Sequence, residues 1–102
     1  MIHVIATLEL AEGARESYLK ELRKIIADVR AEKGCIDYGP AADIATDIPV
    51  QEKTGPDVVT IVERWTDLEA LKAHLVAPHM KTYREATKTV VKKLSVRILE
   101  PL

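Results

Sequence analysis

The order of two kinds of hydrophobic repeat constrains the fold of this chain more than any other feature. Residues 2–10 alternate between apolar and mixed positions, as a half-buried strand does, whereas residues 18–29 carry apolar side chains at helical spacings of three and four. A second strand is predicted over 35–42. The strand–helix–strand order then returns, with strands over 58–65 and 94–100. Two such units in succession predict a ferredoxin-like split βαβ sandwich of the α+β class.

Local signals mark where the predicted helices begin and end. The first helix should run for about 19 residues and end near Gly34, because a glycine tolerates the left-handed conformation found after helices. Thr66 and Glu69 have the spacing of a capping box, which predicts the start of the next helix. Pro78 is typical of a first helical turn. The buried side of the helix that follows is expected to hold Met80, Tyr83, either Ala86 or Thr87, and Val90.

The segment 43–57 is predicted to be a long connection without regular structure. It contains two prolines, one glycine and scattered polar residues. Loops of this length are uncommon in small domains and are often functional, so we expect this one to lie over a site. Pro40 cannot donate to a sheet, which places the 35–42 strand near an edge.

A four-stranded antiparallel sheet with helices on one face leaves its other face for water or a partner. Ile5 and alternate residues of the 58–65 strand make that face apolar in this chain. We therefore expect a homodimer packed sheet against sheet, which is a dimeric α/β barrel. The alternate residues are either Val59, Ile61 and Trp65, or Val58 and Val62, depending on which set faces away from the helices.

Length and charge exclude several classes of protein. The 102 residues allow one domain, over 1–102, and its 15 basic against 16 acidic residues leave a net charge of −1. Proteins that bind phosphate backbones or anionic membranes carry a basic excess, so neither partner is expected. The lone cysteine cannot form an intrachain disulfide. No apolar stretch approaches the length of a membrane span and the first ten residues lack a leader pattern, which predicts a cytoplasmic protein without membrane insertion.

Four residues stand out as candidates for chemistry or binding. His74, on the flank of the helix after Trp65, is either a histidine hydrogen-bonded at the core edge or a proton acceptor at a pocket rim. Trp65 is either a core anchor or a flat wall for an aromatic ligand. Glu63 shares the strand face of Trp65 and needs a partner. His79 is expected to stay neutral as a cap at a helix N-terminus. The partner of Glu63 is expected among Arg64, Arg84 and Arg97.

Known site motifs are missing from the chain. The glycines are dispersed, so there is no phosphate loop, and neither His-Glu-x-x-His nor Cys-x-x-Cys occurs. His74 and His79 are five residues apart, about 500° around a helix, so we expect them on different faces and expect no metal site from this pair. Residues alone thus predict a small dimeric α+β domain with a pocket between its sheet and helices.

The run from Ile61 to His79 resembles the signature of the antibiotic biosynthesis monooxygenase family. The opening strand–glycine–helix, the pair Gly34–Cys35 and the closing residues 96–99 are similar to the same family, so that the resemblance covers the whole chain. It is closest to the small bacterial quinol monooxygenases of the menadiol type, which have a stretch like residues 78–81.

This resemblance implies a dimeric enzyme that oxygenates a hydroquinone or polyphenol with O₂ and uses no metal, flavin or haem. It implies that His74 is the base or phenolate partner and that Tyr83 and Arg84 donate to the reduced oxygen. Trp65 would form an aromatic wall and Glu63 would hold the site in place. The residues expected to contact substrate are Trp65, Glu63, His79 and Met80.

Other branches of the family give competing interpretations. Polyketide-tailoring members place Asn and Tyr near the matching tryptophan, where this chain has Ile61 and Leu71. Haem-degrading members use Asn, Trp and His at positions that fall near Ala6, His74 and Tyr83, and none matches. An isomerase branch acting on small phosphorylated hydroxy-diketones is the alternative enzyme, since it resembles this chain at His74, Pro78, His79 and Lys81. A non-catalytic dimer that binds small aromatics as a stress or sensor module is the third hypothesis.

Overall fold

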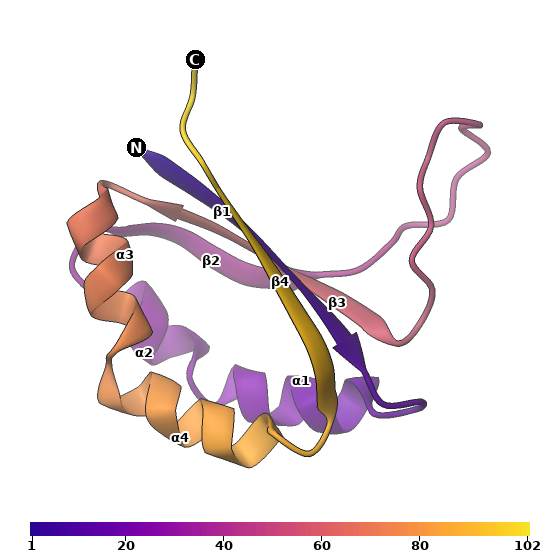
Figure 1. Ribbon diagram of the computed structural model, residues 1–102, viewed down its shortest axis with the longest axis horizontal. Coiled ribbons are helices and arrows are strands. Elements are labelled where there is room, and N and C mark those ends of the chain that lie inside the picture. Colours follow the sequence, from indigo (N-terminus) through magenta and orange to yellow (C-terminus); the bar gives the residue numbers. More distant parts are fainter.

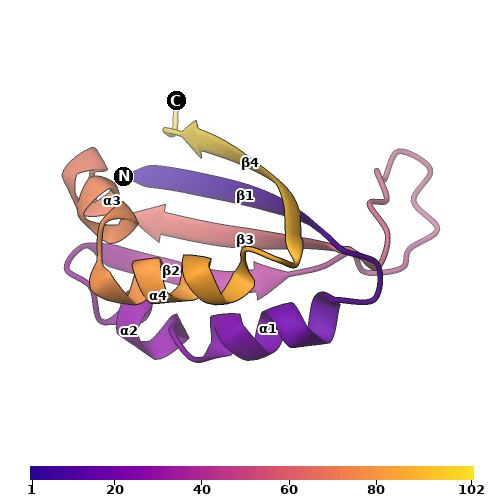
Figure 2. The same ribbon diagram turned by 60° about the horizontal axis from the view of Figure 1, so that its bottom comes forward.

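A computed structural model describes residues 1–102 as one antiparallel sheet with all of its helices on one face (Figures 1 and 2). The strand order is β2-β3-β1-β4, which confirms the predicted ferredoxin-like fold. The strands are β1 (Ile2–Leu10), β2 (Cys35–Ala41), β3 (Val58–Trp65) and β4 (Val91–Leu99), and the helices are α1 (Arg15–Arg23), α2 (Ile26–Arg30), α3 (Leu68–Leu75) and α4 (Pro78–Thr87).

Three strands lie within one residue of their predicted bounds, and β2 is an edge strand as Pro40 indicated. The last strand begins three residues earlier than predicted. Its start is set by pairing with β1, since Leu10 pairs with Val91 and the amide of Ala11 donates to the carbonyl of Val90 at 2.8 Å. The chain therefore leaves α4 earlier than its apolar spacing suggested.

The single long helix predicted before Gly34 is wrong, because the structure divides it into α1 and α2. The amides of Lys24 and Ile25 donate to carbonyls three residues earlier, at 3.2 and 3.0 Å, and this spacing tightens the turn. Leu22 and Val29, on either side of the break, both remain fully buried. The break redirects the helix while keeping its apolar stripe on the sheet.

Gly34 lies in the turn into β2 and not directly at the helix end, since α2 is already capped at Ala31. Its φ of +86° is in the left-handed region that favours glycine. A Cβ there would lie 2.5 Å from the Cβ of Ala70 and 2.7 Å from Oγ1 of Thr66. The position therefore needs glycine for both its backbone and its neighbours.

The capping box predicted at Thr66 is also wrong. Asp67 is the N-cap of α3, and its Oδ1 accepts the amide of Ala70 at 2.8 Å. Thr66 instead donates its amide to the carbonyl of Gly34, which ties it to the turn before β2. The prediction that Pro78 opens a helix is confirmed.

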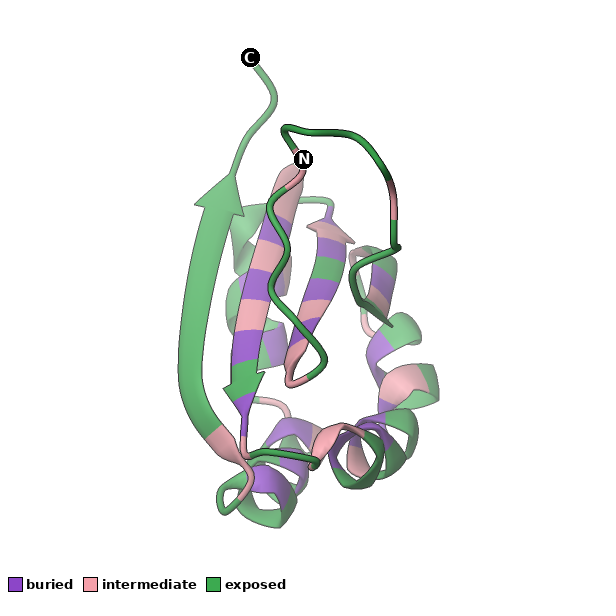
Figure 3. Cartoon of the chain, turned by 90° about the vertical axis from the view of Figure 1, so that its right-hand side faces the viewer, coloured by how far each residue is buried: buried purple, intermediate pink, exposed green.

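Burial alternates along the two central strands, β1 and β3 (Figure 3). On β3 the set Val59, Ile61 and Trp65 is buried beneath the helices, which resolves the question left open by the sequence. The face away from the helices carries Val62, 40% exposed, beside its half-buried cross-strand partner Ile5. This open face is the one on which we expect a second chain.

The 43–57 connection projects from one end of the sheet, away from the helices (Figure 1). Its two halves are held together by Asp43, whose Oδ2 accepts the amide of Thr54 at 2.6 Å. No residue of this segment lines the pocket described below. The expectation that it lies over a site is therefore not met within a single chain.

Candidate active site

An apolar pocket of about 150 Å³ lies between the sheet and helices α3 and α4. Even an enclosed apolar cavity of roughly this volume holds benzene, so the pocket has room for an aromatic ring. Twelve of its 15 lining residues are hydrophobic, which makes it a poor host for a strongly polar ligand. The lining residues are Val4, Ala6, Leu8, Tyr38, Ile61, Glu63, Leu71, His74, Leu75, Met80, Tyr83, Arg84, Leu94, Val96 and Ile98.

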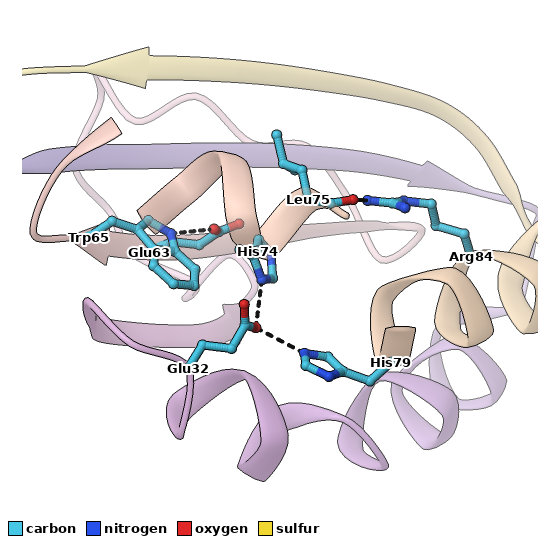
Figure 4. Close-up of polar contacts among 7 residues, drawn as sticks. All are labelled: Glu32, Glu63, Trp65, His74, Leu75, His79 and Arg84. Atoms are coloured by element: carbon cyan, nitrogen blue, oxygen red, sulfur yellow. Dashed lines mark hydrogen bonds and ion pairs between the residues drawn. The ribbon is translucent and has the colours of Figure 1, made fainter. Parts of the chain in front are cut away.

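His74 is a buried histidine in the lining of this pocket, and Figure 4 shows its contact with Glu32. It was expected on the flank of α3, but only 2% of it is exposed. Its Nδ1 lies 2.8 Å from Oε2 of Glu32. Since an ionised carboxylate only accepts, Nδ1 carries the proton and Nε2 keeps a free lone pair. Burial lowers the pKa of His74 although Glu32 opposes that effect, so the neutral imidazole is favoured.

Glu32 belongs to the same candidate site, although no pattern in the sequence pointed to it. It lies in the turn between α2 and β2, and the same Oε2 is also 2.9 Å from Nε2 of His79. The expectation that the two histidines point to different faces assumed one continuous helix. It fails because they belong to different helices, α3 ending at Leu75 and α4 beginning at Pro78. Both imidazoles converge on one carboxylate. His79 is not a cap, since the N-cap of α4 is Ala77.

Trp65 lies behind the pocket lining and does not form part of its wall, contrary to expectation. Its ring is 4.7 Å from that of His74, centre to centre, at an interplanar angle of 35°. Its Nε1 donates to Oε1 of Glu63 at 2.9 Å. The indole is fully buried, so it fixes the orientation of both the imidazole and the carboxyl group.

Glu63 has no arginine partner, which corrects the sequence-based expectation. Arg64 pairs with Asp37 at 3.8 Å, and Nη2 of Arg84 donates to the carbonyl of Leu75. Burial raises the pKa of Glu63 to about 7, although its hydrogen bond from Trp65 works in the opposite direction. The pocket therefore contains a carboxyl group that exchanges its proton near neutral pH.

The phenol of Tyr83 reaches the pocket from α4. Its hydroxyl is 2.6 Å from the hydroxyl of Tyr18, and burial raises the pKa of both phenols, so they stay protonated at neutral pH. Met80 and Arg84 line the same pocket. Of the seven residues predicted for the site, five line the pocket, whereas Trp65 and His79 contact the lining residue His74 and its partner Glu32 from behind.

Comparisons with known proteins identify the family of this chain. The family described as "Antibiotic biosynthesis monooxygenase" matches residues 1–86. A protein named "Probable quinol monooxygenase YgiN" from Escherichia coli (strain K12) is 38% identical over 103 residues, which cover 99% of this chain and 98% of YgiN.

Solved structures are similar over nearly the whole chain. PA3566 from Pseudomonas aeruginosa has a TM-score of 0.80 at 26% identity, covering 99% of this chain and 93% of its own. Rv0793 from Mycobacterium tuberculosis has a TM-score of 0.79 at 26% identity, and the match covers 99% of this chain and 94% of Rv0793.

The fold and the pocket define a small ferredoxin-like domain with an apolar pocket between its sheet and its helices. The chain belongs to the antibiotic biosynthesis monooxygenase family, and its enzyme class is that of a monooxygenase. None of its helices has the length and apolar character needed to cross a membrane.

Proposed function

We propose that this chain oxygenates a quinol-type aromatic with O₂, without a metal, flavin or haem in the reaction. The observation that carries the proposal is His74, a neutral imidazole in an apolar pocket whose Nδ1 is held by Glu32. The identity to a protein named as a probable quinol monooxygenase supports the same substrate class. A flat ring matches the size and the apolar lining of the pocket.

The first step is removal of a phenolic proton by Nε2 of His74. In an apolar pocket the resulting phenolate is poorly solvated and electron-rich, which favours transfer of one electron to O₂. Glu32 accepts the Nδ1–H bond throughout and stabilises the imidazolium that forms. Glu32 is thus a positioning residue, since it acts through His74.

The second step joins the two radicals that the electron transfer leaves. Superoxide and the semiquinone radical combine at a ring carbon to form a peroxide, and the imidazolium returns its proton as the O–O bond breaks. One oxygen atom stays on the ring and the other leaves as water. The balance is quinol plus O₂ giving hydroxyquinone plus water, so the substrate itself supplies all the electrons.

The remaining lining residues have supporting roles in this scheme. Tyr83 keeps its proton and Arg84 its positive charge, so that both can stabilise reduced oxygen. Met80 contacts the ring of the substrate. Trp65 and Glu63 hold His74 and the pocket wall in place, and His79 acts on the substrate only through Glu32.

The pocket favours oxygenation over the isomerase alternative. A phosphorylated substrate needs several donors or cations around its phosphate. Arg84 is the only cationic side chain in the lining, since the imidazole of His74 is neutral, and its guanidinium already donates to the carbonyl of Leu75. The hypothesis of a non-catalytic binding module predicts quinone binding without turnover. The oxygen-uptake experiment below distinguishes this outcome from catalysis.

We also propose that two chains pack through the open face of the sheet. Val62 and Ile5 lie side by side on that face. Burying such a patch against a copy of itself is the arrangement that a two-fold symmetric dimer requires.

The proposal is tested by oxygen uptake with menadiol as the probe and a chelator present. The chain should consume oxygen well above the spontaneous rate, and His74→Ala should lower kcat by about 10² to 10⁴-fold, the range expected for a general base. His3→Ala, which changes a histidine of β1 outside the pocket, is the matched control. A rate equal to that of the protein-free sample would contradict the proposal, and menadione binding without turnover would favour the sensor module.

A further inference from the structure

We propose that Glu32, His74 and His79 form a binding site for a divalent first-row transition metal ion, and that the ion blocks the oxygenation when it is bound. The ion would be an inhibitor of the active site and not a cofactor of its reaction. The three residues come from the turn after α2, the end of α3 and the start of α4 (Figure 4). One ligand atom from each lies within 4.8 Å of the other two.

The distances within the cluster suit a shared ion. Oε2 of Glu32 lies 2.8 Å from Nδ1 of His74 and 2.9 Å from Nε2 of His79. Adjacent ligands around an ion with bonds of about 2.1 Å are roughly 3.0–3.4 Å apart. The carboxylate therefore already has nearly the required separation from each nitrogen, and only the two nitrogens must approach each other.

The charge of the cluster also favours a cation. Glu32 has no lysine or arginine within salt-bridge distance, and its two partners are the imidazoles. No lysine or arginine therefore serves as counterion to this carboxylate. A divalent ion supplies that charge, and two imidazoles with one carboxylate select zinc, iron, cobalt or nickel over calcium and magnesium. Three protein ligands leave a position for water.

The cluster can take up an ion from solvent without opening the pocket. The side chains of His79 and Glu32 are 22% and 14% exposed, whereas that of His74 is 2% exposed. Of the three, only His74 also lines the pocket. An ion would thus enter on the solvent side of His74 and contact the nitrogen opposite the substrate.

A metal ion bound at this site would turn His74 from a proton acceptor into a donor toward the substrate. This part of the inference rests on the proposed function. An ion bound at Nδ1 displaces the proton from that nitrogen, and a neutral imidazole then carries its proton on Nε2. The nitrogen left for the substrate becomes a donor and cannot accept the phenolic proton. The proton thus moves from Nδ1 to Nε2 by exchange with solvent, and the neutral imidazole releases no net proton.

Cobalt titration of the full chain tests the site directly. Because Co²⁺ bound to nitrogen and oxygen ligands absorbs visible light, the titration should show one ion per chain, which Zn²⁺ displaces. His79→Ala should weaken cobalt binding at least tenfold. Glu32→Gln should have the same effect and replaces His79→Ala if that variant does not fold. His3→Ala should bind as the wild type does. Failure to bind cobalt, or equal binding by His79→Ala and the wild type, would overturn the site.

An activity measurement tests the block separately. Zinc should inhibit menadiol oxygenation by the wild type. For each protein the inhibition is expressed as a fraction of its own zinc-free rate. The same fractional inhibition of His79→Ala should require at least ten times more zinc. Stoichiometric zinc binding at an unchanged rate would overturn the block. If no sample oxygenates menadiol, the proposed function fails, while the cobalt titration still decides whether the metal site exists.

Discussion

At the scale of single residues, Glu63 links the stability of the chain to pH. Its pKa rises from 4.5 to about 7 on folding, because burial penalises the carboxylate. The folded state therefore holds this proton to higher pH than the unfolded state does. The free energy of unfolding should fall as pH rises from about 4.5 to about 7, by about 3 kcal/mol in total for this group.

Glu63→Gln should remove that loss. The amide has the same size, and its oxygen can still accept from Trp65, but it does not titrate. Urea denaturation at pH 5 and pH 8 should show the wild type losing more stability between the two values than the variant does. Glu69→Gln, at an exposed surface position, should follow the wild type. Equal pH dependence in Glu63→Gln and the wild type would show that the buried carboxyl group is not the cause.

Glu32→Gln tests whether Glu32 fixes the tautomer of His74. The amide NH₂ can donate to Nδ1, which would move the imidazole proton to the nitrogen that should stay free. We expect kcat for menadiol to fall between about 10-fold and 10⁴-fold, as when other groups that orient a histidine are changed. The ¹⁵N NMR spectrum of His74 should show the proton leaving Nδ1. An unchanged spectrum together with an unchanged kcat would refute this role.

The sequence predicted some of these residues and not others for a physical reason. His74 and Glu63 interrupt apolar faces of strongly periodic elements, so a local pattern marks them. Glu32 lies in a charged turn, and its partners are 42 and 47 residues away in the chain. Likewise, the tryptophan partner of Glu63 lies on the same strand, whereas two of the three expected arginines, Arg64 and Arg84, contact Asp37 and Leu75.

At the scale of elements, the turn at Gly34 joins β2 to the start of α3. Gly34→Ala should cost about 2–4 kcal/mol, because it adds backbone strain at positive φ to a close contact with Ala70 and Thr66. Gly13→Ala is the matched control, since Gly13 has a φ of +73° but no heavy atom within 4 Å of an added Cβ. It should cost only the strain, about 1 kcal/mol. Equal losses for the two variants in urea denaturation would contradict the packing role of Gly34.

Strands were predicted more accurately than helices, because each strand is fixed by both alternation and pairing. The apolar spacing of residues 18–29 continues across the break at Lys24 and Ile25, so nothing in the pattern reveals it. The cap at Asp67 was missed because Thr66 also has a suitable side chain. Only the contact of Thr66 with Gly34 distinguishes the two.

At the scale of the whole molecule, a single chain leaves apolar side chains of its sheet exposed to solvent. Val62 of β3 is exposed on the open face. On β4, at the border of the pocket, the exposed fractions of Leu94, Val96 and Ile98 are 57%, 50% and 52%. The fold itself followed from the order of periodic segments. The proposed dimer needs a second chain, and the sequence indicates it only through these unpaired apolar positions.

Light scattering after size exclusion tests the proposed dimer. The wild type should have twice the chain mass of 11.4 kDa. Val62→Lys should give the mass of one chain, since it places a charge at the centre of the expected interface. Leu68→Lys, at an exposed position of α3, should leave the mass unchanged. A wild type of single-chain mass, or a dimer that survives Val62→Lys, would contradict packing through this face.

Isotope labelling tests the central claim most directly, namely that this pocket inserts one atom of O₂ into a quinol. Menadiol is turned over under ¹⁸O₂ with the chelator present, and the organic product is weighed by mass spectrometry. We predict a hydroxyquinone that carries one ¹⁸O atom, formed by the wild type and not by His74→Ala. Unlabelled menadione as the sole product would contradict it, because the chain would then only oxidise the quinol.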